Sequence, residues 1–216
     1  LRRGGVACLS KRFIRRREIN THADKTVVFI DGPNLYATAK ALGTAVDFKK
    51  WLAEFKDVTR WGDVLRHVYF TAVPGTDEYN SIKPLIDWLV YNGFTLVTKP
   101  TKSFTDEETG RRKVKGNMDV ELTVEAMEMA KSGHMSDAVL VTGDGDFTAL
   151  VLALKRMGIH VTVISTLKVS PPMIADELRR AADIFIDLSD MLDSVGMSEG
   201  DRRTPRRDEV WAGDRA

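Results

Sequence analysis

The chain has 216 residues, of which 43% are hydrophobic and 29% are charged. That balance is typical of one globular domain and unlike that of a disordered or membrane-embedded chain, and no apolar stretch is long enough to span a bilayer. The single cysteine, Cys8, excludes an intramolecular disulfide and a cysteine-based zinc site. We therefore expect a protein of a reducing compartment, the cytoplasm.

The net charge of +1 is distributed unevenly along the chain. Residues 1–20 hold seven Lys or Arg and one acid, whereas residues 21–193 hold 20 basic and 25 acidic residues. We expect residues 1–24 to form a disordered basic arm that attracts polyanions, residues 25–190 to form the folded domain, and residues 191–216 to form a disordered tail. An Arg-rich leader is also typical of transit peptides, so an organelle matrix is the alternative location.

Strand and helix patterns alternate along the expected domain. It begins with an apolar strand at 26–30, a turn at Asp31–Asn34 and a helix at 35–42. Further strands are predicted at about 64–72, 94–98, 138–142, 160–164 and 184–188, and further helices at about 47–57, 79–91, 117–131, 146–157 and 171–182. Nearly continuous apolar strands are typical of a parallel sheet covered on both faces. The sequence thus predicts an α/β fold, an open, doubly wound, mostly parallel sheet with helices on both faces.

One predicted connection, residues 99–116, is much longer than the roughly 2–6 residues usual between a strand and a helix. It contains six basic residues and three acids, the acids clustered at 106–108. Long connections in compact domains often carry function, and a hairpin could form here around Glu108–Gly110. A solvated excursion without function is the alternative.

Four carboxylates are expected at one edge of the sheet. Asp31 follows the first strand, and Asp144 and Asp146 follow the fourth. Asp119 lies in the first turn of the helix after the third strand, and that helix begins at the edge where the strand ended. Ligands of open parallel sheets bind at this carboxyl edge.

Each of these acids has a structural alternative. Asp119 would stabilise a helix start, Asp146 would cap a helix, and Asp31 would form a turn. Those roles do not require the acids to share one edge, so they explain the set less well than a common site does. Crowded carboxylates repel one another unless a cation compensates, and oxygen ligands without Cys or a well-placed His select Mg²⁺ or Mn²⁺. Such a site predicts metal-dependent phosphodiester hydrolysis.

Three segments resemble the signature blocks of a known family: Phe29–Leu35, Lys115–Val120 and Thr142–Phe147. They are similar in order and spacing to the blocks of the NYN domain, in the LabA-like branch of the PIN-like ribonuclease superfamily. The resemblance covers about residues 25–190. It implies a metal-dependent RNA nuclease with a central parallel sheet and an acidic pocket.

The resemblance also implies roles for particular residues. Asp31, Asp119 and Asp144 match the metal-binding, catalytic acids of the family, and Asp146 matches a second acid of the last block that binds metal through water or caps the next helix. Polar neighbours from the same three blocks are expected to orient the acids: Asn34, Thr142 and Asn117. Thr142 stands where the family often has Ser, and the hydroxyl is retained.

An acidic pocket by itself repels RNA, so the phosphate contacts must come from basic residues elsewhere. The candidates lie on the first helix of the domain and on the long connection: Lys40, Lys99, Lys102, Arg111, Arg112, Lys113 and Lys115. Tyr36 or Phe104 could stack on an unpaired base. No feature encodes base readout, so we expect single-stranded or structured RNA with weak sequence preference.

Other functions fit the sequence less well. A haloacid-dehalogenase-type phosphatase needs a second Asp where Pro33 stands, and a dinucleotide site needs a third glycine where Thr148 stands. The four histidines form no evident catalytic pair. The serious alternative is a catalytically weak PIN-like module that binds RNA or protein and keeps a vestigial metal site. A homodimer and protein partners that bind the tails stay open.

Overall fold

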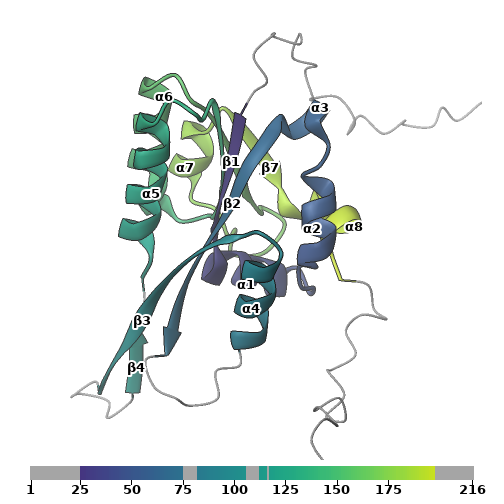
Figure 1. Cartoon of the computed structure of the whole chain (residues 1–216). Helices are drawn as coiled ribbons and strands as arrows, with labels where there is room; N and C mark the ends of the chain where they lie inside the picture. The colour runs from purple at the N-terminus through teal and green to yellow at the C-terminus, as the bar shows by residue number, and fades with distance from the viewer. Residues whose placement is uncertain (1–24, 75–81, 106–111, 116, 198–216) are drawn as a thin grey trace, which may run out of the picture.

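The computed structural model describes residues 25–74, 82–105, 112–115 and 117–197 (Figure 1). Their centre is a sheet in the order β4-β3-β2-β1-β5-β6-β7. Its strands are β1 (Lys25–Asp31), β2 (Asp63–Pro74), β3 (Thr95–Thr105), β4 (Arg112–Lys115), β5 (Asp137–Val141), β6 (His160–Ser165) and β7 (Ile184–Asp187). All neighbouring pairs are parallel except β3 and β4. The predicted mostly parallel sheet is therefore confirmed.

Helices cover both faces of this sheet (Figure 1). They are α1 (Gly32–Ala41), α2 (Phe48–Glu54), α3 (Val58–Trp61), α4 (Lys83–Tyr91), α5 (Asp119–Lys131), α6 (Thr148–Arg156), α7 (Asp176–Ala181) and α8 (Leu192–Val195), with short 3-10 turns η1 (Gly145–Phe147) and η2 (Leu188–Asp190). Among the described residues, no helix combines the length and apolar character needed to cross a bilayer.

The sheet separates two apolar cores, and β1 contributes to both. Val27 and Phe29 pack with α5, α6 and α7, whereas Val28 and Ile30 pack with α1, α2 and α4. These four side chains are fully buried, because successive residues of a strand point to opposite faces and both faces are covered. The continuous apolar run in the sequence follows from this double burial, and the predicted doubly wound fold is confirmed.

The strand order reverses between β1 and β5. From β1 the chain moves outward to β2 and β3 on one side, and from β5 it moves outward to β6 and β7 on the other. The helices that follow β1 and β5 therefore lie on opposite faces. Such a reversal opens a crevice at the carboxyl ends of the two strands, which is where this class of fold binds ligands.

The long connection extends the sheet. β3 continues to Thr105 and pairs with β4 in antiparallel register, so that Lys102 lies opposite Lys115. The expected hairpin is present in the backbone, while its centre, residues 106–111, lies outside the described residues. Two helices begin later than predicted, α4 at Lys83 and α7 at Asp176. For α7 the reason is Pro171–Pro172, since a residue before proline disfavours the helical conformation.

The described fold also runs past residue 190, into the segment that we assigned to a tail. α8 packs against α2, and the backbone N–H of Met197 donates to the carbonyl oxygen of Ala45 at 2.9 Å. Val46 and Gly196 form an antiparallel bridge. A four-residue helix and a single bridge leave no periodic pattern in a sequence, so residues 191–197 could not be recognised as part of the domain. Residues 1–24 and 198–216 lie outside the described residues.

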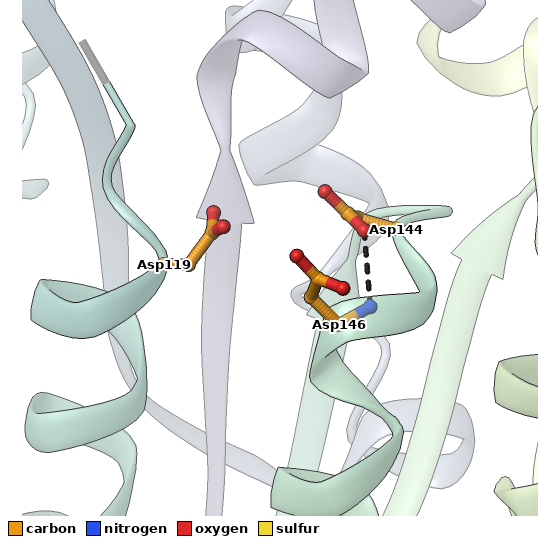
Figure 2. Close-up of side chains that lie close together, drawn as sticks. All are labelled: Asp119, Asp144 and Asp146. Carbon is orange, nitrogen blue, oxygen red and sulfur yellow. Dashed lines mark hydrogen bonds between the residues drawn. The ribbon is translucent and has the colours of Figure 1, made fainter.

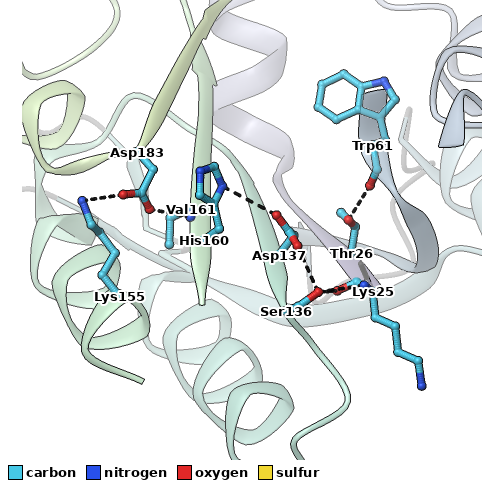
Figure 3. Close-up of polar contacts among 9 residues, drawn as sticks. All are labelled: Lys25, Thr26, Trp61, Ser136, Asp137, Lys155, His160, Val161 and Asp183. Atoms are coloured by element: carbon cyan, nitrogen blue, oxygen red, sulfur yellow. Dashed lines mark hydrogen bonds and ion pairs between the residues drawn. The ribbon is translucent and has the colours of Figure 1, made fainter. Parts of the chain in front are cut away.

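Polar side chains fasten the amino ends of the strands, opposite the reversal crevice (Figure 3). The backbone N–H of Lys25 donates to Ser136 Oγ at 2.8 Å, which ties β1 to β5. Asp183 accepts from the backbone N–H of Val161 at 2.9 Å and pairs with Lys155 Nζ at 2.9 Å. Asp183 at this edge is thus paired with a lysine, and the polar contacts here stabilise the positions of neighbouring strands.

Candidate functional site

Asp31 ends β1 and caps α1. Its backbone is extended, and its Oδ1 accepts from the backbone N–H of Asn34 at 3.3 Å. Pro33 in the first turn has a fixed φ and no N–H, which favours a helix start at this position. The other carboxylate oxygen of Asp31, Oδ2, accepts from Thr142 Oγ1 at 3.1 Å. One side chain therefore starts the helix and joins β1 to the end of β5.

Burial raises the pKa of Asp31 to about 6. The hydrogen bonds from Asn34 and Thr142 act in the opposite direction, and the charges of Asp119 and Asp144 raise the pKa further. Burial disfavours the charged form of an acid, and a hydrogen bond to the carboxylate only partly compensates. Asp31 thus lies within electrostatic reach of two other acids, and its ionised form is less stable than that of an exposed Asp.

Asp119, Asp144 and Asp146 form an acidic cluster. Each offers one carboxylate oxygen, and these oxygens all lie within 4.8 Å of one another. Figure 2 shows Asp119 at the start of α5 pointing toward Asp144 and Asp146, which come from the loop after β5 and from η1. The structure therefore brings acids from distant parts of the sequence to one place, and Asp31 borders them.

Local hydrogen bonds hold two of these acids in position. Asp144 caps η1, because its Oδ1 accepts from the backbone N–H of Asp146 at 3.0 Å. The capping role considered for Asp146 thus belongs to Asp144, and Asp146 is exposed within η1. Asn117 Nδ2 donates to Asp119 Oδ2 at 2.5 Å, and Asn117 Oδ1 accepts from the backbone N–H of Asp119 at 2.8 Å. Burial nevertheless raises the pKa of Asp119, and the charges of Asp144 and Asp146 add to that effect.

Thr142 and Asn34 connect the segments that carry the acids. The Thr142 hydroxyl donates to Asp31 and accepts from the backbone N–H of Asp144 at 3.2 Å. Within the described residues, no hydrogen bond joins the Asn34 side chain to a carboxylate; its Oδ1 accepts from the backbone N–H of Gly143 at 3.0 Å. Asn34 therefore fixes the loop that carries Asp144 to the start of α1, and acts on the acids through the backbone.

Close packing beneath the acidic loop requires a glycine. A Cβ atom at Gly143 would lie 1.6 Å from the carbonyl oxygen of Met173, in the segment before α7. That segment is tied down by the backbone N–H of Ala175, which donates to the Gly143 carbonyl oxygen at 2.9 Å. A Cβ at Gly145 would lie 2.7 Å from Glu177 Oε1. Glu177 is thus an acid close to the loop that carries Asp144 and Asp146. We did not single it out, because the predicted helix at about 171–182 placed it in the second turn and not at the helix start.

Of the basic residues expected to contact RNA, Lys99 is paired with an acid and Lys40 is exposed. Lys99 Nζ forms an ion pair with Glu121 at 2.7 Å, and the hydrogen bond from Lys99 lowers the pKa of that acid. The charge of Lys99 is therefore already balanced within the fold. Lys40 is exposed, and its Nζ lies 5.9 Å from the centroid of the Tyr36 ring. The other candidates lie outside the residues whose side chains the structure describes: Lys102, Arg111, Arg112, Lys113 and Lys115.

The acidic cluster has the chemistry of a metal site. Its donors are carboxylate oxygens, which suit hard divalent ions. Within the described part of the chain, no Lys or Arg forms an ion pair with Asp31, Asp119, Asp144 or Asp146. Three acids in close reach, none of them paired with a Lys or Arg whose side chain the structure describes, fit a bound cation, whereas Asp183 at the amino edge is paired with Lys155.

Comparisons with known proteins agree with this geometry. The family model of the NYN domain matches residues 25–191. The chain belongs to the NYN domain family, a family of PIN-like nucleases. It is 30% identical over 176 residues to the low amplitude and bright protein LabA of Synechococcus elongatus, which covers 81% of this chain and 89% of LabA. The resemblance stated from the three sequence blocks is confirmed.

A solved structure shows the same fold. It is that of VPA0982, a protein of unknown function from Vibrio parahaemolyticus, with a TM-score of 0.64 and 23% sequence identity. The similarity covers 82% of this chain and 99% of that protein. At this identity the likeness concerns the arrangement of the sheet and helices.

Proposed function

We propose that this NYN domain protein is a metal-dependent ribonuclease that hydrolyses RNA phosphodiester bonds at the acidic cluster. The observation that carries the proposal is the cluster of Asp119, Asp144 and Asp146, whose oxygens lie within 4.8 Å and which no described Lys or Arg neutralises. Membership of a PIN-like nuclease family supports the same reaction class. Mg²⁺ or Mn²⁺ is the ion that such oxygen donors select.

Each acid has its own part in this proposal. Asp119 and Asp144, whose carboxylates are oriented by hydrogen bonds, would hold the ion together with the exposed Asp146. Asp31 adds negative charge from the buried side. When bound, the ion supplies Lewis acidity toward a phosphoryl oxygen. With a pKa of about 6, Asp31 is mostly ionised at neutral pH and accepts a proton more readily than an ordinary Asp does.

RNA is the substrate class that the basic residues favour. The exposed Lys40 lies on α1, the helix that Asp31 starts. Strand pairing places Lys102 opposite Lys115 and Phe104 opposite Lys113 on the β3–β4 hairpin, so basic residues gather on that ribbon. Figure 1 shows the hairpin at the same end of the sheet as α1. Cations placed around an acidic pocket hold phosphates while the pocket acts on one of them.

A second function, an RNA- or protein-binding module with a vestigial metal site, is favoured by one observation. Asp31 and Asp144 both cap helical segments, which gives each acid a structural reason to be present. Capping alone requires neither the approach of Asp119 nor the exposed Asp146. We therefore place hydrolysis first and binding without catalysis second.

The test is cleavage of labelled RNA by the purified full chain with Mg²⁺ or Mn²⁺, beside Asp119→Asn and Asp144→Asn. Glu128→Gln is the matched control, because it removes one exposed charge from the same helix as Asp119. We expect the wild type and the control to cleave and both Asp variants to lose cleavage. If the wild type binds RNA but cleaves no better than the Asp variants across several RNAs, the binding module is the correct function.

A further inference from the structure

A concave site lies on the face of the sheet that α1, α2 and α4 cover. It is a cavity of about 490 Å³, within the range of small-molecule sites. Its walls come from α1, the start of α2, β2, α4 and the end of the described chain, and include Leu35, Tyr36, Phe48, Tyr69, Trp88 and Met197. Four aromatic side chains thus line a mostly apolar hollow, and none of the residues proposed for metal binding lines it.

Tyr69 connects this cavity to the acidic cluster. Its ring lines the cavity and packs edge-on against Phe48 at 5.7 Å between centroids. The same ring lies against Gly32, where a Cβ atom would meet the Tyr69 hydroxyl oxygen at 2.6 Å. Gly32 directly follows Asp31. A single aromatic ring therefore separates the cavity from the residue that borders the cluster, and α1 runs from one site to the other.

Cations stand at the mouth of the cavity. Lys49 lines it, and Lys40 lies over the ring of Tyr36, which is 66% exposed. Neither lysine forms an ion pair with another described residue. The carboxylate of Asp47 also lines the cavity, but it is occupied by the backbone N–H groups of Lys49 and Lys50. The rim therefore offers two positive charges and an exposed aromatic face.

An aromatic hollow with a cationic rim suits a nucleotide. Bases stack on aromatic side chains, and ammonium groups bind the phosphates on either side of the ribose. The Tyr69 hydroxyl donates no hydrogen bond to any described residue, so it is available to a polar atom of a ligand. A base held in a duplex cannot leave its stack to enter such a hollow without losing its pairing. The chemistry therefore favours an unpaired nucleotide.

We propose that the cavity is a nucleoside subsite that takes the base and ribose of a nucleotide next to the scissile phosphate of single-stranded RNA, while Lys40 and Lys49 bind the flanking phosphates. The proposal rests on the proposed ribonuclease function for the position of the scissile phosphate. It adds a binding site for one unpaired nucleotide and the residues that form it. The cavity binds by stacking, which accepts any base and thus gives weak sequence preference.

The test measures RNA binding in EDTA, where cleavage does not interfere. Fluorescence anisotropy of the full chain with a labelled single-stranded RNA decamer compares Tyr36→Ala with Tyr91→Ala. Tyr91 is the matched control, an exposed tyrosine on α4 that does not line the cavity. We expect Tyr36→Ala to weaken binding about 10-fold or more and Tyr91→Ala to leave it unchanged. Binding of the same sequence as a duplex should not distinguish the two variants.

The salt dependence of RNA affinity tests separately whether the lysines at the mouth of the cavity bind phosphate. Lys49→Ala should lower the slope of log affinity against log salt by about 0.7, the value for one lost phosphate contact on a single strand. Lys56→Ala, an exposed lysine beyond the other end of α2, should leave the slope unchanged.

The outcomes separate this proposal from the proposed function. Equal binding by Tyr36→Ala and Tyr91→Ala, or an equal loss of single-strand and duplex binding, overturns the subsite whatever the cleavage assay shows. Tyr36-dependent binding without cleavage keeps the nucleoside site and refutes the ribonuclease. A wild-type chain that binds no RNA overturns both.

Discussion

Replacing Asp31 with Asn should stabilise the metal-free protein at neutral pH. Burial raises the pKa of Asp31 from 3.8 to about 6. An acid with a raised pKa binds its proton more tightly in the folded state, so its ionisation destabilises the fold. This loss of folding stability is absent below pH 3.8, the pKa of Asp31 in the unfolded chain, and is fully present above pH 6. At pH 7 it corresponds to about 3 kcal/mol.

The stability gained by Asp31→Asn should be smaller than the about 3 kcal/mol that ionisation of Asp31 costs. Asn is a good helix cap and can still accept from the backbone N–H of Asn34. Its amide group would face the Thr142 hydroxyl, however, and the present hydrogen bond would have to reverse its direction. We expect a net stabilisation of about 1–2 kcal/mol, which raises the melting temperature of a domain of this size by about 2–8 °C.

Thermal unfolding in EDTA at pH 7.5 and at pH 4.5 measures this effect. The gain should shrink at pH 4.5, where Asp31 of the wild type is already protonated, and divalent metal should raise the melting temperature of the wild type more than that of the variant. Asp57→Asn is the control: Asp57 also caps a helix, α3, but the hydrogen bond from Thr59 lowers its pKa, so its replacement should bring no gain. A melting temperature of Asp31→Asn below that of the wild type at pH 7.5, or a gain of the same size at pH 4.5, would refute the reasoning.

Two further predictions follow from other titrating and hydrogen-bonding groups. His67 packs between Phe55 and Phe94, and burial lowers its pKa to about 4. Because His67 takes up a proton below pH 6.5 in the unfolded chain and not in the folded one, the wild type should lose about 2 kcal/mol more of its stability between pH 7 and 5 than a chain without this histidine. Asp31 contributes in the opposite sense over the same range, so the comparison with a variant isolates the loss caused by His67. Urea unfolding should show that His67→Phe removes this loss, and an identical loss in the variant would contradict the assignment. Thr142→Val removes the hydroxyl that donates to Asp31 and should shift the acid limb of the pH–rate profile for RNA cleavage upward, whereas Thr142→Ser should not. An unshifted profile in Thr142→Val would show that the hydroxyl does not position this acid.

Much of the fold was predictable because burial on both faces leaves a strong local pattern. The apolar run from Ala138 to Val141 is recognisable as a strand without knowledge of its neighbours, and it lies between β1 and β6 as a central strand of a parallel sheet must. Elements held by a few long-range contacts left no such pattern. α8 is only four residues long, and its position depends on packing against α2, more than a hundred residues earlier in the chain.

The charged residues illustrate the same limit within the candidate site. Lys99 was expected to meet phosphate, and only the packing of β3 against α5 brings Glu121 to it. The cavity lined by Tyr36 and Tyr69 is formed by side chains from five separate segments, so no local sequence pattern predicts it. A capping role was considered for Asp146, but the cap is Asp144, because η1 begins at Gly145, two residues earlier than such a cap would require.

By itself the sequence predicted which acids come together and which edge of the sheet they share. Parallel strands joined by crossover helices must end at a common edge, so acids placed after two strands and at the start of a crossover helix have to meet there. Only the tertiary structure decided how they meet: Asp119, Asp144 and Asp146 within 4.8 Å, and Asp31 buried beside them with a hydrogen bond to Thr142. Distances between segments about a hundred residues apart depend on how both cores pack, and that information is spread over the whole chain.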